Sequence, residues 1–85
     1  MSKKEKLLEK LRARPKNFTW DEAVSLMESC DFSVRNARGG GSGRMFIHGP
    51  SKLKVRLHEP HPSKTLLPYM LDRLIEALTE IGELK

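Results

Sequence analysis

Between Phe32 and His58 the chain alternates apolar and polar residues in three short segments, and this period of two is typical of half-buried strands. The segments are residues 32–36, 44–48 and 53–58. The glycine-rich stretch 38–43 separates the first two, and Gly49-Pro50-Ser51-Lys52 separates the last two. Because such a short turn places neighbouring strands side by side, we expect an antiparallel hairpin there. The pattern predicts a three-stranded antiparallel sheet.

A first helix is predicted over residues 3–14, where apolar residues repeat at helical spacing. Its apolar stripe consists of Leu7, Leu8 and Leu11. Ser2 precedes the stripe and belongs to the residue types that cap helices. Pro15 ends the helix because proline has no amide hydrogen to donate.

Two further helices are indicated by their end signals. Thr19 and Glu22 have the spacing of a capping box, which begins a helix. Its apolar face comprises Trp20, Ala23, Val24 and Met27, with Leu26 and Cys30 at the margins. The last helix is predicted from residue 66 or 68 to residue 81, since Pro68 is tolerated in a first turn and Gly82 is placed to end it.

The order of predicted elements is α-α-β-β-β-α, which indicates an α+β fold. A three-stranded antiparallel sheet with the helices packed on one face buries every apolar surface in that order. A chain of 85 residues is the size of one domain. We therefore expect a single domain over residues 1–85, with residues 1–16 as an N-terminal helical extension and residues 17–84 as the core.

The charge of the chain is unevenly distributed. The net charge is +5, and no Asp or Glu occurs from residue 32 to residue 58. The cations in that span are Arg35, Arg38, Arg44, Lys52, Lys54 and Arg56. Such a field attracts polyanions, of which nucleic acid is the commonest in a cell and an anionic membrane surface is the rival.

Composition also bears on metals, membranes and redox chemistry. The three histidines and one cysteine do not show the usual metal-ligand spacing, so we expect no metal and no cofactor. Cys30 lies in a helical apolar pattern and is interpreted as a small buried residue. No apolar run has the length of a membrane span, and we expect a cytoplasmic protein with no membrane partner.

The strand alternation predicts which residues face the helices. Burying several unpaired cations would be very costly, so the apolar sets should face inward. These sets are Phe32 and Val34, Met45 and Ile47, and Leu53, Val55 and Leu57. The outer face is then predicted to carry Arg35, Arg44, Phe46, His48, Lys54, Arg56 and His58. Cations neutralise phosphates and an exposed ring stacks on a base, so this face is interpreted as a nucleic-acid-binding surface, for RNA or DNA alike, in preference to an ordinary solvated sheet face.

Three features follow one another along the chain: Gly41-Ser42 leading to Phe46 and His48, then Leu57-His58-Glu59-Pro60-His61-Pro62, and then an apolar helix. In this order they resemble the HicA family. The resemblance covers residues 20–84, and the segment before it looks like an N-terminal extension found in some members. It implies a double-stranded-RNA-binding-domain-like fold. It further implies an RNA-binding toxin of a type II toxin–antitoxin system, an endoribonuclease (mRNA interferase) that a HicB-like antitoxin neutralises.

One position departs from the family pattern. The best-known members carry a catalytic His directly after the Gly-Ser pair, whereas here Gly43 fills that place. Glycine has no side chain for acid–base work. Three explanations stay open: this branch uses other groups, the protein is an inactive relative, or Gly43 is a substitution that cells tolerate.

Metal-free RNA cleavage needs a base, an acid and cations that stabilise the developing charge. Histidine suits both proton roles near neutral pH. His58 is the best candidate base because it neighbours Arg56, and Arg44 and Arg56 are expected to grip the phosphate. His48 and His61 are further catalytic candidates, although His61 also fits a structural role between its prolines. Ser42 completes the set of predicted RNA-binding residues.

Other functions remain in competition with an endoribonuclease. A catalytically inactive RNA-binding or protein-interaction module of the same fold retains the basic surface without the chemistry. DNA binding is less favoured, because no basic recognition helix follows a short turn.

Overall fold

Three antiparallel strands and two layers of helix make up the part of the chain that the structure describes. The computed structural model describes residues 2–36, 43–60 and 63–84. Its elements are α1 (Lys3–Arg12), α2 (Trp20–Ser29), β1 (Phe32–Asn36), β2 (Gly43–His48), β3 (Lys54–His58) and α3 (Pro68–Glu80). The sheet order is β1-β2-β3. The predicted α+β fold and the order α-α-β-β-β-α are confirmed.

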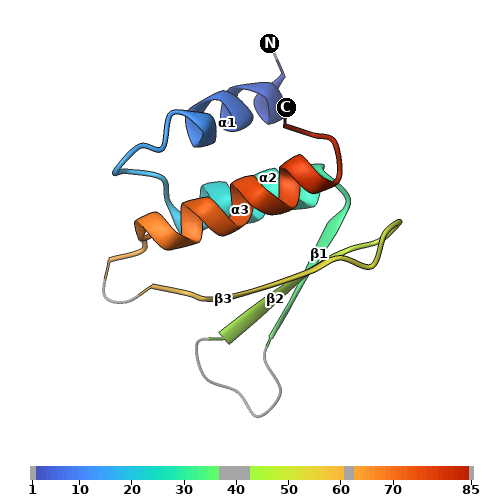
Figure 1. The fold of residues 1–85 in the computed structure, drawn as a ribbon. Coiled ribbons are helices and arrows are strands. Elements are labelled where there is room, and N and C mark those ends of the chain that lie inside the picture. The colour runs from blue at the N-terminus through green and yellow to red at the C-terminus, as the bar shows by residue number, and fades with distance from the viewer. Residues whose placement is uncertain (1, 37–42, 61–62, 85) are drawn as a thin grey trace.

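The helices lie on one side of the sheet (Figure 1). Helix α2 packs on β1, α3 packs on β3, and α1 packs on α2 and α3. The sheet is thus covered by α2 and α3, while α1 forms a second helical layer farther out. The opposite face of the sheet carries no helix in the described chain (Figure 1).

The helix ends follow the predicted signals. The Ser2 hydroxyl accepts a hydrogen bond from the Glu5 amide at 3.1 Å, and Thr19 and Glu22 form the complete capping box. Pro68 occupies the first turn of α3. Helix α1 ends at Arg12, earlier than predicted, and Arg14 adopts a positive φ of 51°. Gly82 has a φ of 87°, the left-handed geometry expected after a helix end.

Apolar residues from every element form one buried cluster. Leu11 of α1 and Leu74 of α3 are fully buried, so the N-terminal helix shares the core of the remaining elements. Leu26, predicted at a margin of α2, is also fully buried, because α2 packs against α1 as well as against strand β1 of the sheet. An ion pair between Lys4 and Glu83 joins α1 to the segment after α3.

Glu22 links the capping box to α1. Its carboxylate accepts hydrogen bonds from Lys10 Nζ at 2.8 and 3.0 Å and from the Thr19 amide at 3.0 Å. Burial acts to raise the pKa of Glu22, but the hydrogen bonds from Lys10 and Thr19 together outweigh it and hold the pKa below its ordinary value of 4.5. The ionised form of Glu22 therefore stabilises the folded state.

This arrangement makes stability depend on pH in the acid range. A carboxylate with a lowered folded pKa contributes stability that is present above pH 4.5 and is lost as the pH falls through the folded value. We expect Glu22→Gln to lower the denaturation midpoint at neutral pH and to flatten its fall in acid. Thermal denaturation followed by circular dichroism between about pH 3 and 7 measures both effects. Parallel pH profiles for parent and variant would contradict this role.

Strand β2 presents to the helices the face opposite to the one predicted. Phe46 is fully buried and His48 is 9% exposed, whereas Met45 and Ile47 are only partly buried. Antiparallel pairing explains the difference, because directly opposed residues share a face. Phe46 pairs with Val34 on β1 and with Val55 on β3. Since both valines face the core, Phe46 must face it too.

Candidate nucleic-acid interface

The helix-free side of the sheet is basic. We call it the open sheet face; register and alternation assign to it Ser33, Arg35, Gly43, Met45, Ile47, Lys54, Arg56 and His58. Arg35, Lys54, Arg56 and His58 are exposed. Because no acid occurs between residues 32 and 58, none of the three strands adds a negative charge to this face. The predicted outer positions of these four residues agree with the structure.

The centre of the open sheet face is a row of three residues across the strands. Arg35 pairs with Met45, and Met45 pairs with Arg56. With strands about 4.8 Å apart, the two arginine backbones lie about 10 Å apart on either side of the methionine. The row borders a groove of about 500 Å³, whose lining is Arg35, Asn36, Gly43, Arg44, Met45, Arg56 and His58. An anionic chain in this groove would meet guanidinium groups on both sides.

His58 lines the same groove and lies directly opposite Gly43 in the β2–β3 register. Side chains at directly opposed positions are close neighbours, with Cβ atoms about 4.5–5.5 Å apart. Because glycine has no side chain, β2 places no functional group of its own opposite the His58 imidazole. An exposed imidazole next to Arg56 on the same strand face has the composition of an acid–base site beside an anion site.

Arg44 differs from its predicted outer position. It pairs with Asn36 and Leu57 on the helix-facing side of the sheet. Its guanidinium lies 3.4 Å from a Glu59 carboxylate oxygen and donates to the Gly43 carbonyl at 2.9 Å. A cation on the inner face is tolerated here because Arg44 lies near the end of β2, where Glu59 is within reach. Arg44 still lines the groove, but it shares its charge with a carboxylate.

His48 is a core residue rather than a member of the outer face. Its Nδ1 lies 2.7 Å from the Ser51 hydroxyl and accepts a hydrogen bond from the Ser51 amide at 3.3 Å. Its ring centroid lies 5.0 Å from that of Phe32. The expectation that His48 and His58 share a face is wrong, because β2 is turned over relative to that prediction. With these contacts His48 holds the β2–β3 turn.

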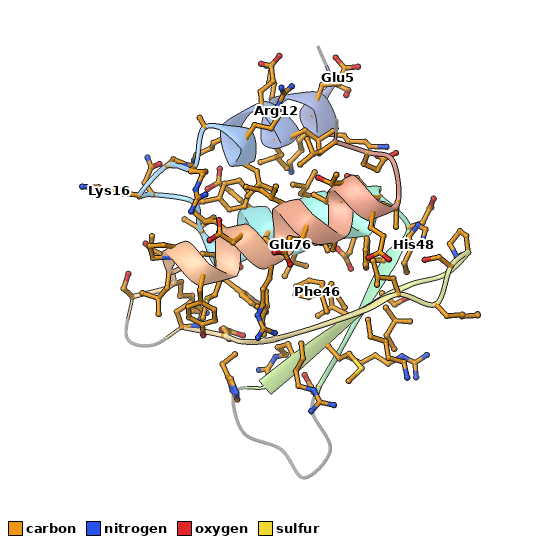
Figure 2. All side chains as sticks on the ribbon, viewed as in Figure 1. Glu5, Arg12, Lys16, Phe46, His48 and Glu76 are labelled. Atoms are coloured by element: carbon orange, nitrogen blue, oxygen red, sulfur yellow. The ribbon has the colours of Figure 1, made fainter. Side chains whose placement is uncertain are left out.

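Phe46 is likewise removed from the predicted ligand surface. Its side chain has no exposed area, and its ring centroid lies 5.5 Å from that of Trp20. Figure 2 shows the Phe46 ring pointing from the sheet toward the helices. A fully covered ring offers no surface on which a base can stack. Sequence reasoning missed Met45, which takes the central place on the open sheet face that Phe46 was expected to hold.

Two predicted site residues, Ser42 and His61, lie outside the described residues.

Cys30 is buried, as expected. Its burial, and after that the neighbouring Glu83 carboxylate, raise the pKa of the Cys30 thiol to about 11. Such a thiol stays protonated at neutral pH and is a poor nucleophile. Among the described side chains, no group of three His, Cys, Asp or Glu is placed to hold a metal ion.

None of the helices in the described ranges has the length and apolar character that crossing a membrane requires.

Comparison with curated proteins and with solved structures found no match. A family model described as the HicA toxin of bacterial toxin–antitoxin matches residues 20–80. The match includes α2, all three strands and α3, and it leaves α1 outside. The chain therefore belongs to the HicA family of bacterial toxin–antitoxin toxins.

Proposed function

We propose that this toxin binds RNA on the open sheet face and cleaves messenger RNA as a metal-independent endoribonuclease. The observation that carries the proposal is the groove lined by Arg35, Arg56 and His58, to which the strands contribute no acid. Cations in a groove neutralise phosphates, and an imidazole beside them supplies proton transfer near neutral pH. A cytoplasmic location and a HicB-like antitoxin as protein partner belong to the same proposal.

Each residue has a defined role in this mechanism. Arg56 and Arg35 hold the phosphate and stabilise the negative charge that develops on it. His58 accepts the proton of the adjacent ribose 2′-hydroxyl, whose oxygen attacks phosphorus. The bond to the 5′-oxygen then breaks, which leaves a 2′,3′-cyclic phosphate. The 5′-oxygen takes a proton from a solvent water, and the resulting hydroxide takes back the proton held by His58. Arg44, paired with Glu59, flanks the groove rather than gripping the phosphate.

A second candidate function is a non-catalytic RNA-binding or protein-interaction module of the same fold. It is favoured by Gly43, which leaves the β2 position opposite His58 without any proton-transfer group. Under this alternative the open sheet face still binds RNA, but bound RNA is not cut. Ser42 is a proposed RNA-binding residue under both candidate functions, whereas His61 is a proposed catalytic residue of the endoribonuclease alone.

Induced expression in a bacterium separates the two functions. An endoribonuclease should arrest growth and fragment transcripts, and co-expression of the neighbouring gene should restore growth if that gene encodes the antitoxin. A binding module should leave transcripts intact at the same protein level. Growth curves together with RNA sequencing of fragment ends measure both outcomes.

The binding surface is tested by Arg56→Ala in the purified protein. Loss of one phosphate contact should weaken binding to every single-stranded RNA alike and should reduce the slope of log affinity against log salt by about 0.7. Arg12→Ala is the matched control, because Arg12 is exposed on α1, in the outer helical layer (Figure 2). Fluorescence anisotropy over a salt series gives the slopes. Equal slopes for the Arg56 and Arg12 variants would contradict the assignment.

A further inference from the structure

A second groove adjoins the open sheet face at His58. It has a volume of about 740 Å³ and lies between the turn after α1, the segment around Ser63–Leu67 and the first turn of α3. A smaller hollow of about 240 Å³, lined by Arg56, Leu57, His58, Tyr69 and Arg73, lies beside it. His58 lines the second groove, the smaller hollow and the groove on the open sheet face. It is the one residue that all three share, and it is the candidate base.

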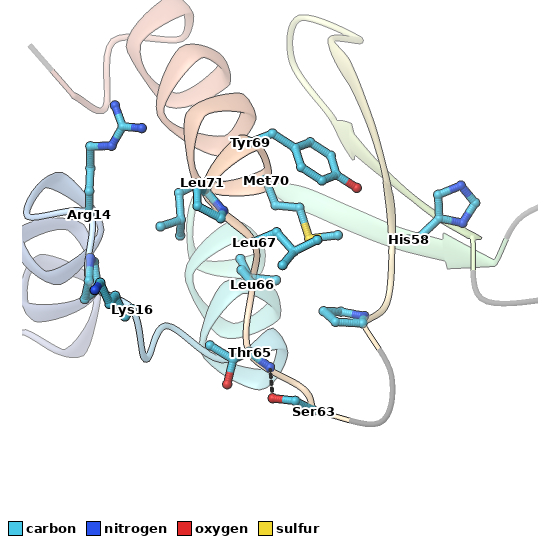
Figure 3. A pocket seen from close by; sticks show the side chains of 13 residues that line it. Arg14, Lys16, His58, Ser63, Thr65, Leu66, Leu67, Tyr69, Met70 and Leu71 are labelled. Atoms are coloured by element: carbon cyan, nitrogen blue, oxygen red, sulfur yellow. Dashed lines mark hydrogen bonds between the residues drawn. The ribbon is translucent and has the colours of Figure 1, made fainter.

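Large apolar side chains are exposed in this second groove. Leu67 is 52% exposed and Tyr69 is 49% exposed, and they are the large hydrophobic residues left in water by the described fold. In Figure 3 the Tyr69 ring extends from α3 toward β3, the strand of His58, while Leu66, Leu67 and Met70 lie beside it. The lining thus combines an accessible aromatic ring with a largely aliphatic surface.

The charges around the groove fit an anionic partner. Lys16 is exposed at its far end, and Arg56 and Arg73 lie in the adjoining hollow. Arg73 donates to the Arg56 carbonyl at 3.3 Å, which holds α3 against the edge strand. The nearby carboxylate of Asp72 is paired with Arg14 at 2.6 Å. An apolar groove with a ring inside and cations at its borders matches a nucleobase with its flanking phosphates.

We propose that this groove holds one unpaired base of the RNA strand, stacked on Tyr69, next to the phosphate at His58. The inference rests on the proposed RNA binding and adds to it a substrate class and a residue. A base inside a duplex is stacked on its neighbours and has no free face for a protein ring. The toxin therefore acts on single-stranded RNA, and its RNA path runs from Arg35 across Arg56 and His58 to Tyr69.

A stacking reporter tests this proposal. The probe is a short single-stranded RNA with one 2-aminopurine and 2′-O-methyl riboses, which cannot be cut because the attacking hydroxyl is blocked. Stacking on an aromatic ring quenches 2-aminopurine fluorescence. The parent and Tyr69→Phe should both quench the probe and bind it alike. Tyr69→Ala should lose the quenching and bind about tenfold more weakly.

Two controls isolate the base contact. Thr79→Ala, a neutral exposed position near the other end of α3, should bind and quench like the parent. An otherwise identical RNA that is abasic at the probe position should bind parent and Tyr69→Ala equally, because it has no base to stack. The Tyr69 variants should retain the urea midpoint of the parent, since an exposed ring contributes little to folding.

The outcomes separate this inference from the proposed function. If the parent does not bind the RNA, both proposals fail. If the parent binds and Tyr69→Ala binds and quenches equally well, RNA binding stands and the base groove is wrong. That second result would assign the exposed Leu67–Tyr69 surface to a protein partner instead. A duplex probe that binds as tightly as the single strand would also overturn the single-strand requirement.

Discussion

Replacing Phe46 with alanine should destabilise the protein more than any other single change on β2, by about 3–5 kcal/mol in the free energy of unfolding. The ring has no exposed area and packs on Trp20. Alanine leaves a cavity between the sheet and the helices. Because small domains are stable by only about 5–15 kcal/mol, this loss is a large fraction of the total. Urea denaturation followed by circular dichroism measures it.

Met45→Ala is the matched control for Phe46→Ala, because the two residues are adjacent on β2 and face opposite sides. Met45 is partly exposed, so its removal should cost about 1 kcal/mol or less. Phe46→Leu should recover most of the lost stability. A larger loss for Met45→Ala than for Phe46→Ala would mean that β2 presents the other face to the helices.

Replacing His58 with alanine should lower the rate of RNA cleavage by about 100- to 10,000-fold, the contribution typical of a general base. RNA affinity should change much less, because Arg35 and Arg56 still line the groove and can bind the phosphate. The side chain is exposed, so the fold should be unaffected. Single-turnover cleavage of labelled RNA, with anisotropy for binding, separates the two effects. Unchanged cleavage by His58→Ala would remove His58 from the mechanism.

The companion variant is Gly43→His, which introduces an imidazole directly opposite His58. Two imidazoles at such a spacing supply an acid and a base to the same phosphate. We expect cleavage to rise by about 100-fold or more. If the parent is inactive and Gly43→His cleaves, the binding-module alternative describes the natural protein. If neither protein cleaves RNA, the open sheet face is not an active site.

The elements themselves were predictable from local patterns. Thr19 and Glu22 specify where α2 begins, Pro68 and Gly82 bound α3, and period-two alternation identifies three strands. These signals depend on neighbours a few residues apart, which the sequence contains. The end of α1 was less well predicted, because Arg14 adopts a left-handed conformation that arginine rarely favours.

The orientation of β2 was mispredicted because hydrophobicity alone does not determine it. Its two faces carry Met45 and Ile47 on one side and Phe46 on the other, with His48 and Arg44 as polar residues beside the ring. The hairpin resolves the ambiguity. The His48 amide donates to the Leu53 carbonyl across the turn at Gly49–Lys52. This hydrogen bond sets the β2–β3 register, in which Phe46 lies opposite Val55. The length of the turn, combined with strand pairing, therefore predicts the correct face of β2.

The candidate site was predictable only in part. Arg35, Lys54, Arg56 and His58 follow from alternation on β1 and β3, where one face is plainly apolar. The groove at Tyr69 was not predicted, because it brings together the turn after α1, residues near Ser63 and the start of α3. Contacts between segments so far apart in the chain depend on tertiary packing rather than on local pattern. The pairing of Arg44 with Glu59 is a tertiary contact of the same kind.

The most direct test of the RNA-binding surface is the side-chain methyl signal of Met45 in a protein labelled with ¹³C-methyl methionine. Met45 lies between Arg35 and Arg56 on the open sheet face, whereas Met27 is fully buried. On titration with single-stranded RNA, the Met45 signal should move in proportion to binding while that of Met27 stays in place. RNA that binds without moving the Met45 signal would contradict the account.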